Sequence, residues 1–147
     1  CSMVSAVVVR SMALVLALAS SCFCTRGPNS QRLDKATREK PLISGAMVAN
    51  ISSELGSIAL RQELRTPSYA IGKAAQNMVT SLLSQALAPR GIKVVALHPG
   101  WVRTDMGGDN AALSVAESAA GLLQVIDHLT SEDSGRFLDW QGDPLPW

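Results

Sequence analysis

Apolar runs of strand length alternate with longer amphipathic segments along the C-terminal part of the chain. Residues 46–51 and 92–97 are almost entirely apolar, and residues 136–140 form a third short run. Apolar runs of about four to eight residues are typical of strands buried on both faces of a parallel sheet. We therefore predict three buried strands, with a loop over residues 54–66, where the sequence is mixed and polar.

Two segments between these runs predict helices. The first begins at Pro67 and ends at the Pro-Arg-Gly sequence of residues 89–91. Ser114 and Glu117 have the spacing of a capping box, which predicts a second helix through about Leu129. The apolar side chains of the first helix recur with the 3.6-residue period of one helix face. They are Ile71, Ala75, Met78, Val79, Leu82, Leu83 and Ala86.

This order of elements predicts an α/β fold. Strand–helix–strand–helix–strand with long crossovers indicates a parallel sheet covered by helices. Ligands of such sheets bind outside the carboxyl ends of the strands. Ser52 and Ser53 follow the first strand, and His98, Pro99 and Gly100 follow the second, so we expect a functional site among them.

The N-terminal residues have a different pattern. Residues 4–9 and 13–19 are apolar and are separated by Arg10. Neither run reaches the roughly 20 residues that a membrane span needs. Residues 3–22 resemble the hydrophobic region of a signal peptide. A misjoined segment or a piece of buried helix are the alternatives.

A linker joins this segment to the rest of the chain. Residues 25–41 are polar and contain Gly-Pro and Pro, which is typical of a loop or linker. We expect an atypical leader and linker over residues 1–41 and one folded domain over residues 42–147. The expected location is the cytoplasm, with the signal-like segment as the alternative.

Composition argues against several kinds of partner. The 147 residues carry 13 Lys and Arg against 12 Asp and Glu, with no long basic run, so we expect no nucleic-acid partner. The three cysteines all lie within the first 24 residues and the two histidines are isolated. We therefore expect no metal site.

Tyr69 and Lys73 stand four residues apart at the start of the first predicted helix. This spacing puts both side chains on one helix face, roughly 5–6 Å apart at Cβ. A neighbouring ammonium stabilises a phenolate, so the tyrosine could give or take a proton near neutral pH. Taken alone, the pair is a weak signal, because Tyr-x-x-x-Lys is common in helices, and it favours two solvated surface side chains.

Three motifs in order resemble the short-chain dehydrogenase/reductase family. They are Asn-Ile-Ser-Ser at residues 50–53, the Tyr69-x-x-x-Lys73 pair, and His-Pro-Gly-Trp-Val-Arg-Thr at residues 98–104. Together with the tail at residues 139–147, they look closest to the C-factor-like and sniffer-type carbonyl reductases. The resemblance implies that residues 42–147 are the C-terminal part of a Rossmann doubly wound parallel sheet, preceded by a non-matching N-terminal segment.

The resemblance also implies roles for the side chains. Tyr69 would protonate a carbonyl oxygen as hydride arrives from a nicotinamide. Lys73 would stabilise the phenolate and hold the nicotinamide ribose hydroxyls, so both residues would also bind the cofactor. Ser53 would hydrogen-bond the substrate oxygen. Ser52 is the alternative, although alternation along the strand end lets only one of the two serines face the site.

The segment after the second strand would complete the cofactor site. By the resemblance, Pro99, Gly100, Val102 and Thr104 would contact the nicotinamide and pyrophosphate side. Turn formation is the other role open to Thr104, and His98 is expected to be structural. The expected cofactor is NADP(H), with NAD(H) possible, and the expected substrate is a small carbonyl or alcohol. A homo-oligomer is possible, and no membrane partner is expected.

One part of the family pattern is missing. No Gly-x-x-x-Gly-x-Gly phosphate loop occurs in the sequence, and Asn29 matches the family's fourth catalytic residue only by coincidence of spacing. We therefore expect a truncated catalytic half that is inactive alone, with an exposed sheet edge and apolar helix faces that promote aggregation. The alternative is a non-catalytic family member that serves as a binding or regulatory module.

Overall fold

The computed structural model describes residues 46–147. The signal-like segment, the polar linker, the three cysteines, Asn29 and the predicted boundary between residues 41 and 42 all lie outside the described residues.

Three parallel strands form the sheet. β1 (Met47–Ile51), β2 (Lys93–His98) and β3 (Phe137–Asp139) lie in the order β1-β2-β3. The predicted strands and their parallel arrangement are confirmed. β3 is shorter than predicted because the chain turns after Asp139, whose carboxylate Oδ1 accepts hydrogen bonds from the backbone N–H groups of Gln141 and Asp143.

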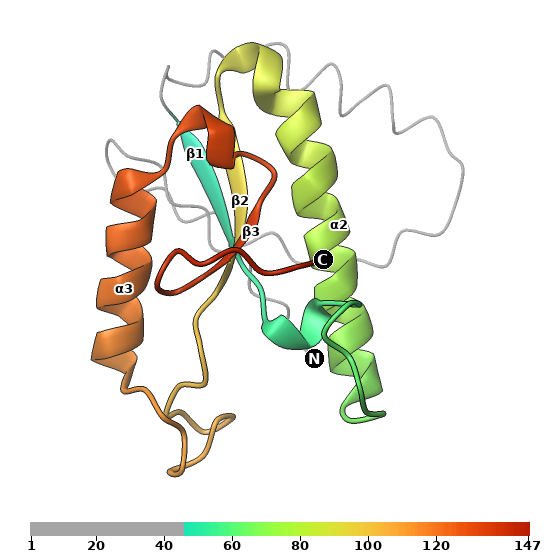
Figure 1. The fold of residues 1–147 in the computed structure, drawn as a ribbon, viewed down its shortest axis with the longest axis vertical. Coiled ribbons are helices and arrows are strands. Elements are labelled where there is room, and N and C mark those ends of the chain that lie inside the picture. Colours follow the sequence, from blue (N-terminus) through green and yellow to red (C-terminus); the bar gives the residue numbers. More distant parts are fainter. Residues whose placement is uncertain (1–45) are drawn as a thin grey trace.

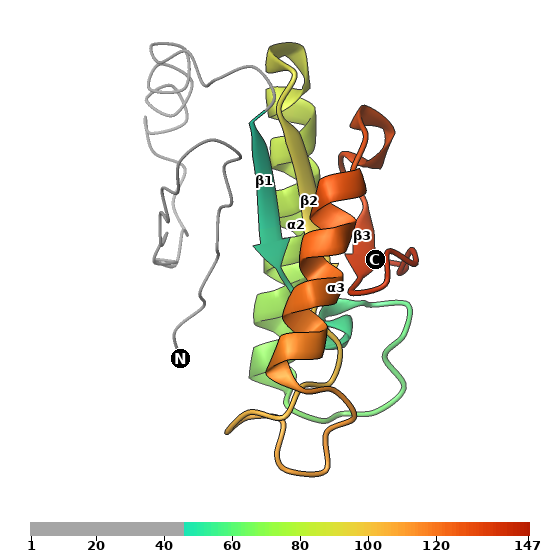
Figure 2. The same cartoon turned by 90° about the vertical axis from the view of Figure 1, so that its left-hand side faces the viewer.

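Two helices cover opposite faces of this sheet. α2 (Pro67–Leu87) lies on one side and α3 (Val115–His128) on the other, as Figures 1 and 2 show. The predicted capping box is present at the start of α3: Ser114 Oγ accepts from the Glu117 N–H, and the Glu117 carboxylate accepts from the Ser114 N–H. Short 3-10 turns are η1 (Glu54–Gly56), η2 (Ala88–Arg90) and η3 (Ser131–Asp133).

The hydrophobic core consists of one cluster on each face of the sheet. Alternate side chains of β1 and β2 point to opposite faces, so neighbouring apolar residues enter different clusters. The cluster under α3 contains Met47, Ala49, Val95, Leu97, Val125, Leu129 and Leu138. The smaller cluster under α2 contains Ala46, Leu87, Ile92 and Val94.

The side of α2 that faces the sheet is mostly polar. Its buried residues are Lys73, Gln76, Asn77, Thr80, Ser84 and Leu87. Hydrogen bonds satisfy this polar side; for example, Asn50 Nδ2 donates to Thr80 Oγ1 at 2.9 Å. Most of the apolar stripe that predicted the helix lies on the opposite, exposed side, where Ile71, Met78 and Leu82 are each more than half exposed. Leu83 is the exception and packs against the core cluster under α2. The expected exposure of an apolar helix face is confirmed for α2.

The carboxyl ends of the strands meet two long loops. Residues 52–66 leave β1 and residues 99–114 leave β2, and both loops lie below the sheet in the view of Figure 1. Among residues 46–147, no helix is long and apolar enough to cross a membrane.

Candidate active site

A cleft of about 1030 Å³ opens at the carboxyl ends of β1 and β2. Its walls come from the loop after β1, the first turn of α2, the loop after β2 and the start of α3. The predicted site residues that line it are Ser53, Tyr69, Pro99, Gly100, Val102 and Thr104, and the alternative serine, Ser52, lines it too. Lys73, the remaining predicted residue, is not among the lining side chains.

Lys73 is buried next to Tyr69. Its Nζ lies 5.8 Å from the centroid of the Tyr69 ring, and its side chain is held against β1. Nζ donates to the Ile51 carbonyl at 2.9 Å and to Gln76 Oε1 at 3.0 Å. Burial lowers the pKa of Lys73. These two bonds use two of the three ammonium hydrogens, so one donor remains for a ligand or for the phenol oxygen.

The two serines after β1 make different contacts. Ser52 Oγ donates to Asn77 Oδ1 on α2, which turns this hydroxyl toward the helix. Ser53 caps η1, and its Oγ accepts from the Leu55 N–H at 3.2 Å. Accepting that bond uses a lone pair, so the Ser53 hydroxyl can still donate to a substrate oxygen.

Gly56 allows η1 to lie directly against α2. A Cβ on residue 56 would come within 2.7 Å of the Lys73 Cβ and 2.8 Å of the Lys73 carbonyl carbon. No side chain other than hydrogen fits this contact. Gly56 was not among the predicted site residues, although its place three residues after Ser53 was the available signal.

Gly100 follows the strand in a left-handed conformation, with φ of 79°. Its absent Cβ would lie 2.5 Å from Leu113 Cδ1 and 3.0 Å from Trp140 Cδ1. Glycine is therefore required here by its own backbone and by two neighbouring side chains. Pro99 is fixed separately, because its carbonyl accepts from Ser118 Oγ on α3 at 2.6 Å.

Thr104 takes part in a turn. Its Oγ1 accepts from the Gly107 N–H at 3.2 Å, and its carbonyl accepts from the Gly108 N–H at 2.8 Å. Arg103, for which no role was predicted, holds a later part of the same loop. Arg103 Nη1 donates to the Ala111 carbonyl at 2.9 Å, and Nη2 lies 3.8 Å from Glu117 Oε2.

His98 lines the cleft, and Glu54 contacts both nitrogens of its ring. Nδ1 accepts from the Glu54 N–H at 3.3 Å, and Nε2 lies 3.8 Å from Glu54 Oε2. Burial lowers the pKa of His98, while the carboxylates of Glu54 and Asp139 partly oppose that shift.

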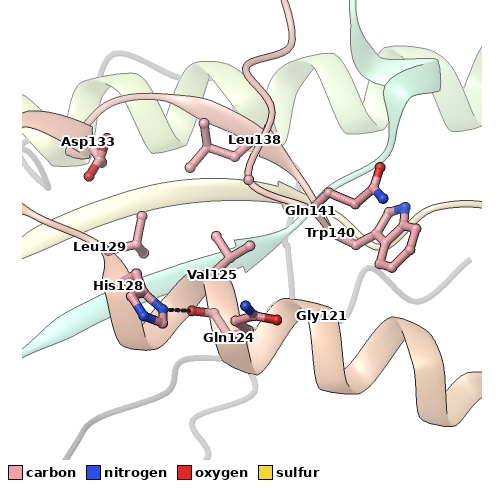
Figure 3. A pocket seen from close by; sticks show the side chains of 10 residues that line it. Gly121, Gln124, Val125, His128, Leu129, Asp133, Leu138, Trp140 and Gln141 are labelled. Carbon is pink, nitrogen blue, oxygen red and sulfur yellow. Dashed lines mark hydrogen bonds between the residues drawn. The ribbon is translucent and has the colours of Figure 1, made fainter.

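A second cavity, of about 490 Å³, lies between α3 and the end of β3 (Figure 3). Val125, Leu129 and Leu138 belong to the core and form part of its wall, and His128 Nδ1 is hydrogen-bonded to the Gln124 carbonyl at 2.7 Å. None of the predicted site residues lines it. The cleft at the strand ends is therefore the better candidate for an active site. Over residues 46–147, no three potential metal-ligating side chains come together.

Comparison with known proteins agrees with the fold and with the motifs. The family model for short chain dehydrogenase matches residues 40–114. C-signal of Myxococcus xanthus is 47% identical over 100 residues, which cover 68% of this chain and 60% of that protein. Carbonyl reductase Sniffer of D. melanogaster superposes with a TM-score of 0.69 at 40% identity, covering 77% of this chain and 46% of Sniffer.

An NADPH-bound carbonyl reductase from chicken fatty liver is also similar, with a TM-score of 0.65 and 45% identity over 69% of this chain and 43% of the reductase. The chain thus spans between 43% and 60% of the length of these three proteins. The family model covers just over half of the chain. The predicted resemblance is confirmed, and the chain belongs to the short-chain dehydrogenase family.

Proposed function

We propose that this chain is the catalytic half of an NADP(H)-dependent oxidoreductase that interconverts small carbonyl compounds and alcohols. The observation that carries the proposal is the convergence of two hydroxyls, from Ser53 and Tyr69, on one cleft, with the Lys73 ammonium directly beside the tyrosine ring. A proton donor and a second hydrogen-bond donor can protonate and stabilise a carbonyl oxygen during reduction, and a neighbouring cation favours the phenolate that proton transfer leaves.

The described residues suit the nicotinamide end of the cofactor. Residues 99–102 and Thr104, after β2, line the same cleft as Tyr69. The buried Lys73 retains one ammonium hydrogen for a ribose hydroxyl or for Tyr69. The sequence has no Gly-rich phosphate loop, so we propose that the adenosine end is bound by residues other than these.

When bound, a reduced nicotinamide supplies the hydride that adds to the carbonyl carbon. Tyr69 then donates its phenolic proton to the carbonyl oxygen, which takes up the electron pair of the former C=O π bond. Lys73 stabilises the resulting phenolate by its positive charge. Ser53 donates a hydrogen bond to the same oxygen as negative charge develops on it. In the oxidising direction these transfers are reversed.

NADP(H) is proposed over NAD(H) because similar structures carry it. The chicken reductase is described as NADPH-bound, and a carbonyl reductase from Pseudomonas aeruginosa, 39% identical, was solved with NADP. NAD(H) stays the alternative, since the sequence lacks the region after a Gly-rich loop in which the selecting residue lies in this fold.

A chimera tests the proposal. Residues 46–147 are joined to the nucleotide-binding half of Sniffer, and carbonyl-dependent oxidation of NADPH is measured. We expect turnover that Tyr69→Phe lowers by about 10²–10⁴-fold. Gln85→Ala, an exposed change on the same helix, is the matched control and should leave turnover unchanged.

Equal turnover by the Tyr69→Phe chimera would contradict the proposed role of the tyrosine. The chain alone provides a second test. We expect purified residues 1–147 to show no NADPH turnover. Robust carbonyl reduction by this chain, abolished by Tyr69→Phe, would show that it needs no separate nucleotide-binding half. The same result would exclude the alternative of a non-catalytic module.

A further inference from the structure

Glu54 contacts both nitrogens of the His98 ring. The Glu54 backbone N–H donates to Nδ1 at 3.3 Å, and its carboxylate Oε2 lies 3.8 Å from Nε2. The His98 side chain is only 12% exposed, whereas that of Glu54 is 52% exposed. Because Nδ1 accepts a hydrogen bond, the neutral ring must carry its hydrogen on Nε2, facing the Glu54 carboxylate.

This contact fixes one end of the peptide that contains Ser53. On the other side of Ser53, the Ser52 N–H donates to the Leu97 carbonyl at 2.7 Å and the Ser52 hydroxyl donates to Asn77. Ser53 is therefore held between an anchor to β2 and α2 and an anchor to the His98 imidazole. Of the two anchors, the imidazole is the one that can change its charge near neutral pH.

We propose that His98 is a positioning residue for Ser53: the neutral imidazole holds the Glu54 amide in place, and protonation of the ring releases it. The proposal rests on the proposed function only in so far as Ser53 is the hydroxyl that binds the substrate oxygen. His98 itself donates no proton to substrate in this scheme.

The chemistry of the ring explains the switch. Protonation places a hydrogen on Nδ1, which turns the acceptor into a donor that faces the Glu54 N–H donor. The bond to the Glu54 amide is lost, and η1 is then joined to His98 only through the ion pair between Nε2 and the exposed Glu54 carboxylate. Residues 53–56 keep the hydrogen bonds within η1 and the one from Asn77 Nδ2 to the Gly56 carbonyl on the α2 side.

The groups around the ring set the pH at which release occurs. Glu54 faces it from η1, Asp139 faces it from β3, and Tyr69 of α2 lines the same cleft. Burial outweighs the two carboxylates, so the pKa of His98 lies below its usual value of 6.5. The neutral ring therefore predominates at pH 7, and the hydrogen bond to the Glu54 amide is lost as pH falls through this lowered pKa.

NMR on the full chain tests this inference. The titration of the His98 ring is compared with the exchange protection of the Glu54 amide and with the Cβ chemical shift of Ser53. We expect both signals to change with the midpoint of the His98 titration. Glu54→Gln should move that midpoint to lower pH, because it removes a carboxylate that favours the charged ring.

Two variants separate positioning from general stability. In His98→Asn, the side-chain Oδ1 can replace Nδ1 as acceptor but cannot titrate, so the Glu54 amide should stay protected without pH dependence. In His98→Leu no acceptor remains, and protection should be lost at every pH. Rescue by Asn and not by Leu would support a hydrogen-bonding role.

The inference would be overturned if the exchange protection of the Glu54 amide did not change with protonation of His98. It would also be overturned if that protection were retained in His98→Leu. A chain that shows the coupling, while the Sniffer chimera shows no Tyr69-dependent turnover, would support the switch and contradict the proposed function alone. The two failures are thus distinguishable.

Discussion

Gly56 and Lys73 lie in direct backbone contact, so that a Cβ on residue 56 would stand 2.7 Å from the Lys73 Cβ. This contact joins the turn after Ser53 to the helix that carries Tyr69. The spacing between the two hydroxyls that line the cleft thus depends on the absence of a side chain at residue 56.

Gly56→Ala should therefore destabilise the protein. The added methyl has no space and must push η1 away from α2, which costs about 1–3 kcal/mol. The free energy of unfolding from urea titration measures the effect. Ile58→Ala, a change at an exposed position of the same loop, should stay within about 0.5 kcal/mol of the original chain. Equal stability of the two variants would show that the turn adapts without cost.

Asn77→Ala should destabilise the same junction by a different route. Asn77 is 3% exposed, accepts from Ser52 Oγ and donates to the Gly56 carbonyl at 3.3 Å. Alanine leaves both buried partners without these bonds, at a cost of about 1–3 kcal/mol. Urea unfolding again measures it, with Gln85→Ala as the exposed polar control on α2. A loss no larger than that of the control would argue against the network.

The strands and helices were predictable because their signals are local. The apolar runs of β1 and β2 are buried on both faces, and the Ser114–Glu117 capping box fixes the start of α3 within a few residues. The ordered motifs likewise brought together the predicted site residues, of which all but Lys73 line one cleft.

The contacts that shape the site were not predictable in the same way. Apolar periodicity identifies α2 but not the side that faces the sheet, because that side is polar and its partners, such as Asn50 for Thr80, are 30 residues away in sequence. The pairing of His98 with Glu54 spans 44 residues. Such contacts depend on how strands and turns meet in space, which a pattern within one segment does not contain.

Gln76→Glu should raise the pKa of Lys73. Burial lowers that pKa, and Gln76 Oε1 accepts from the ammonium at 3.0 Å. A carboxylate in the same place favours the charged form. The titration of the Lys73 Cε resonance measures the shift, and Gln85→Glu places the same charge on the exposed side of the helix as a control. An unchanged Lys73 titration would mean that residue 76 does not contact the ammonium.

Acid should weaken the fold through His98. The pKa of His98 is lower in the folded chain than its usual 6.5, so the unfolded chain binds more protons below that pH. The stabilisation from the neutral ring is therefore present above about pH 6.5 and is lost as pH falls through the lowered folded value. His98→Asn should make the free energy of unfolding less dependent on pH between about 7 and 5. Gln85→Asn, a non-titrating change on the exposed side of α2, should leave that dependence as it is. A pH dependence that His98→Asn does not alter would contradict this role of His98.

The exposed side of α2 should drive self-association. Lys73 is the single charged residue of this helix and is buried, so the solvent-facing stripe around Met78 and Leu82 carries no charge to oppose contact between copies. Met78→Glu combined with Leu82→Lys places an ion pair at the i,i+4 spacing that favours helix and leaves net charge unchanged. At each protein concentration, this variant should scatter less light than the original chain does. Circular dichroism should show the same helix content for both. Gln124→Glu with Gln141→Lys adds the same two charges at exposed positions outside the stripe and should leave scattering unchanged. If both pairs reduce scattering equally, the association does not depend on the α2 stripe.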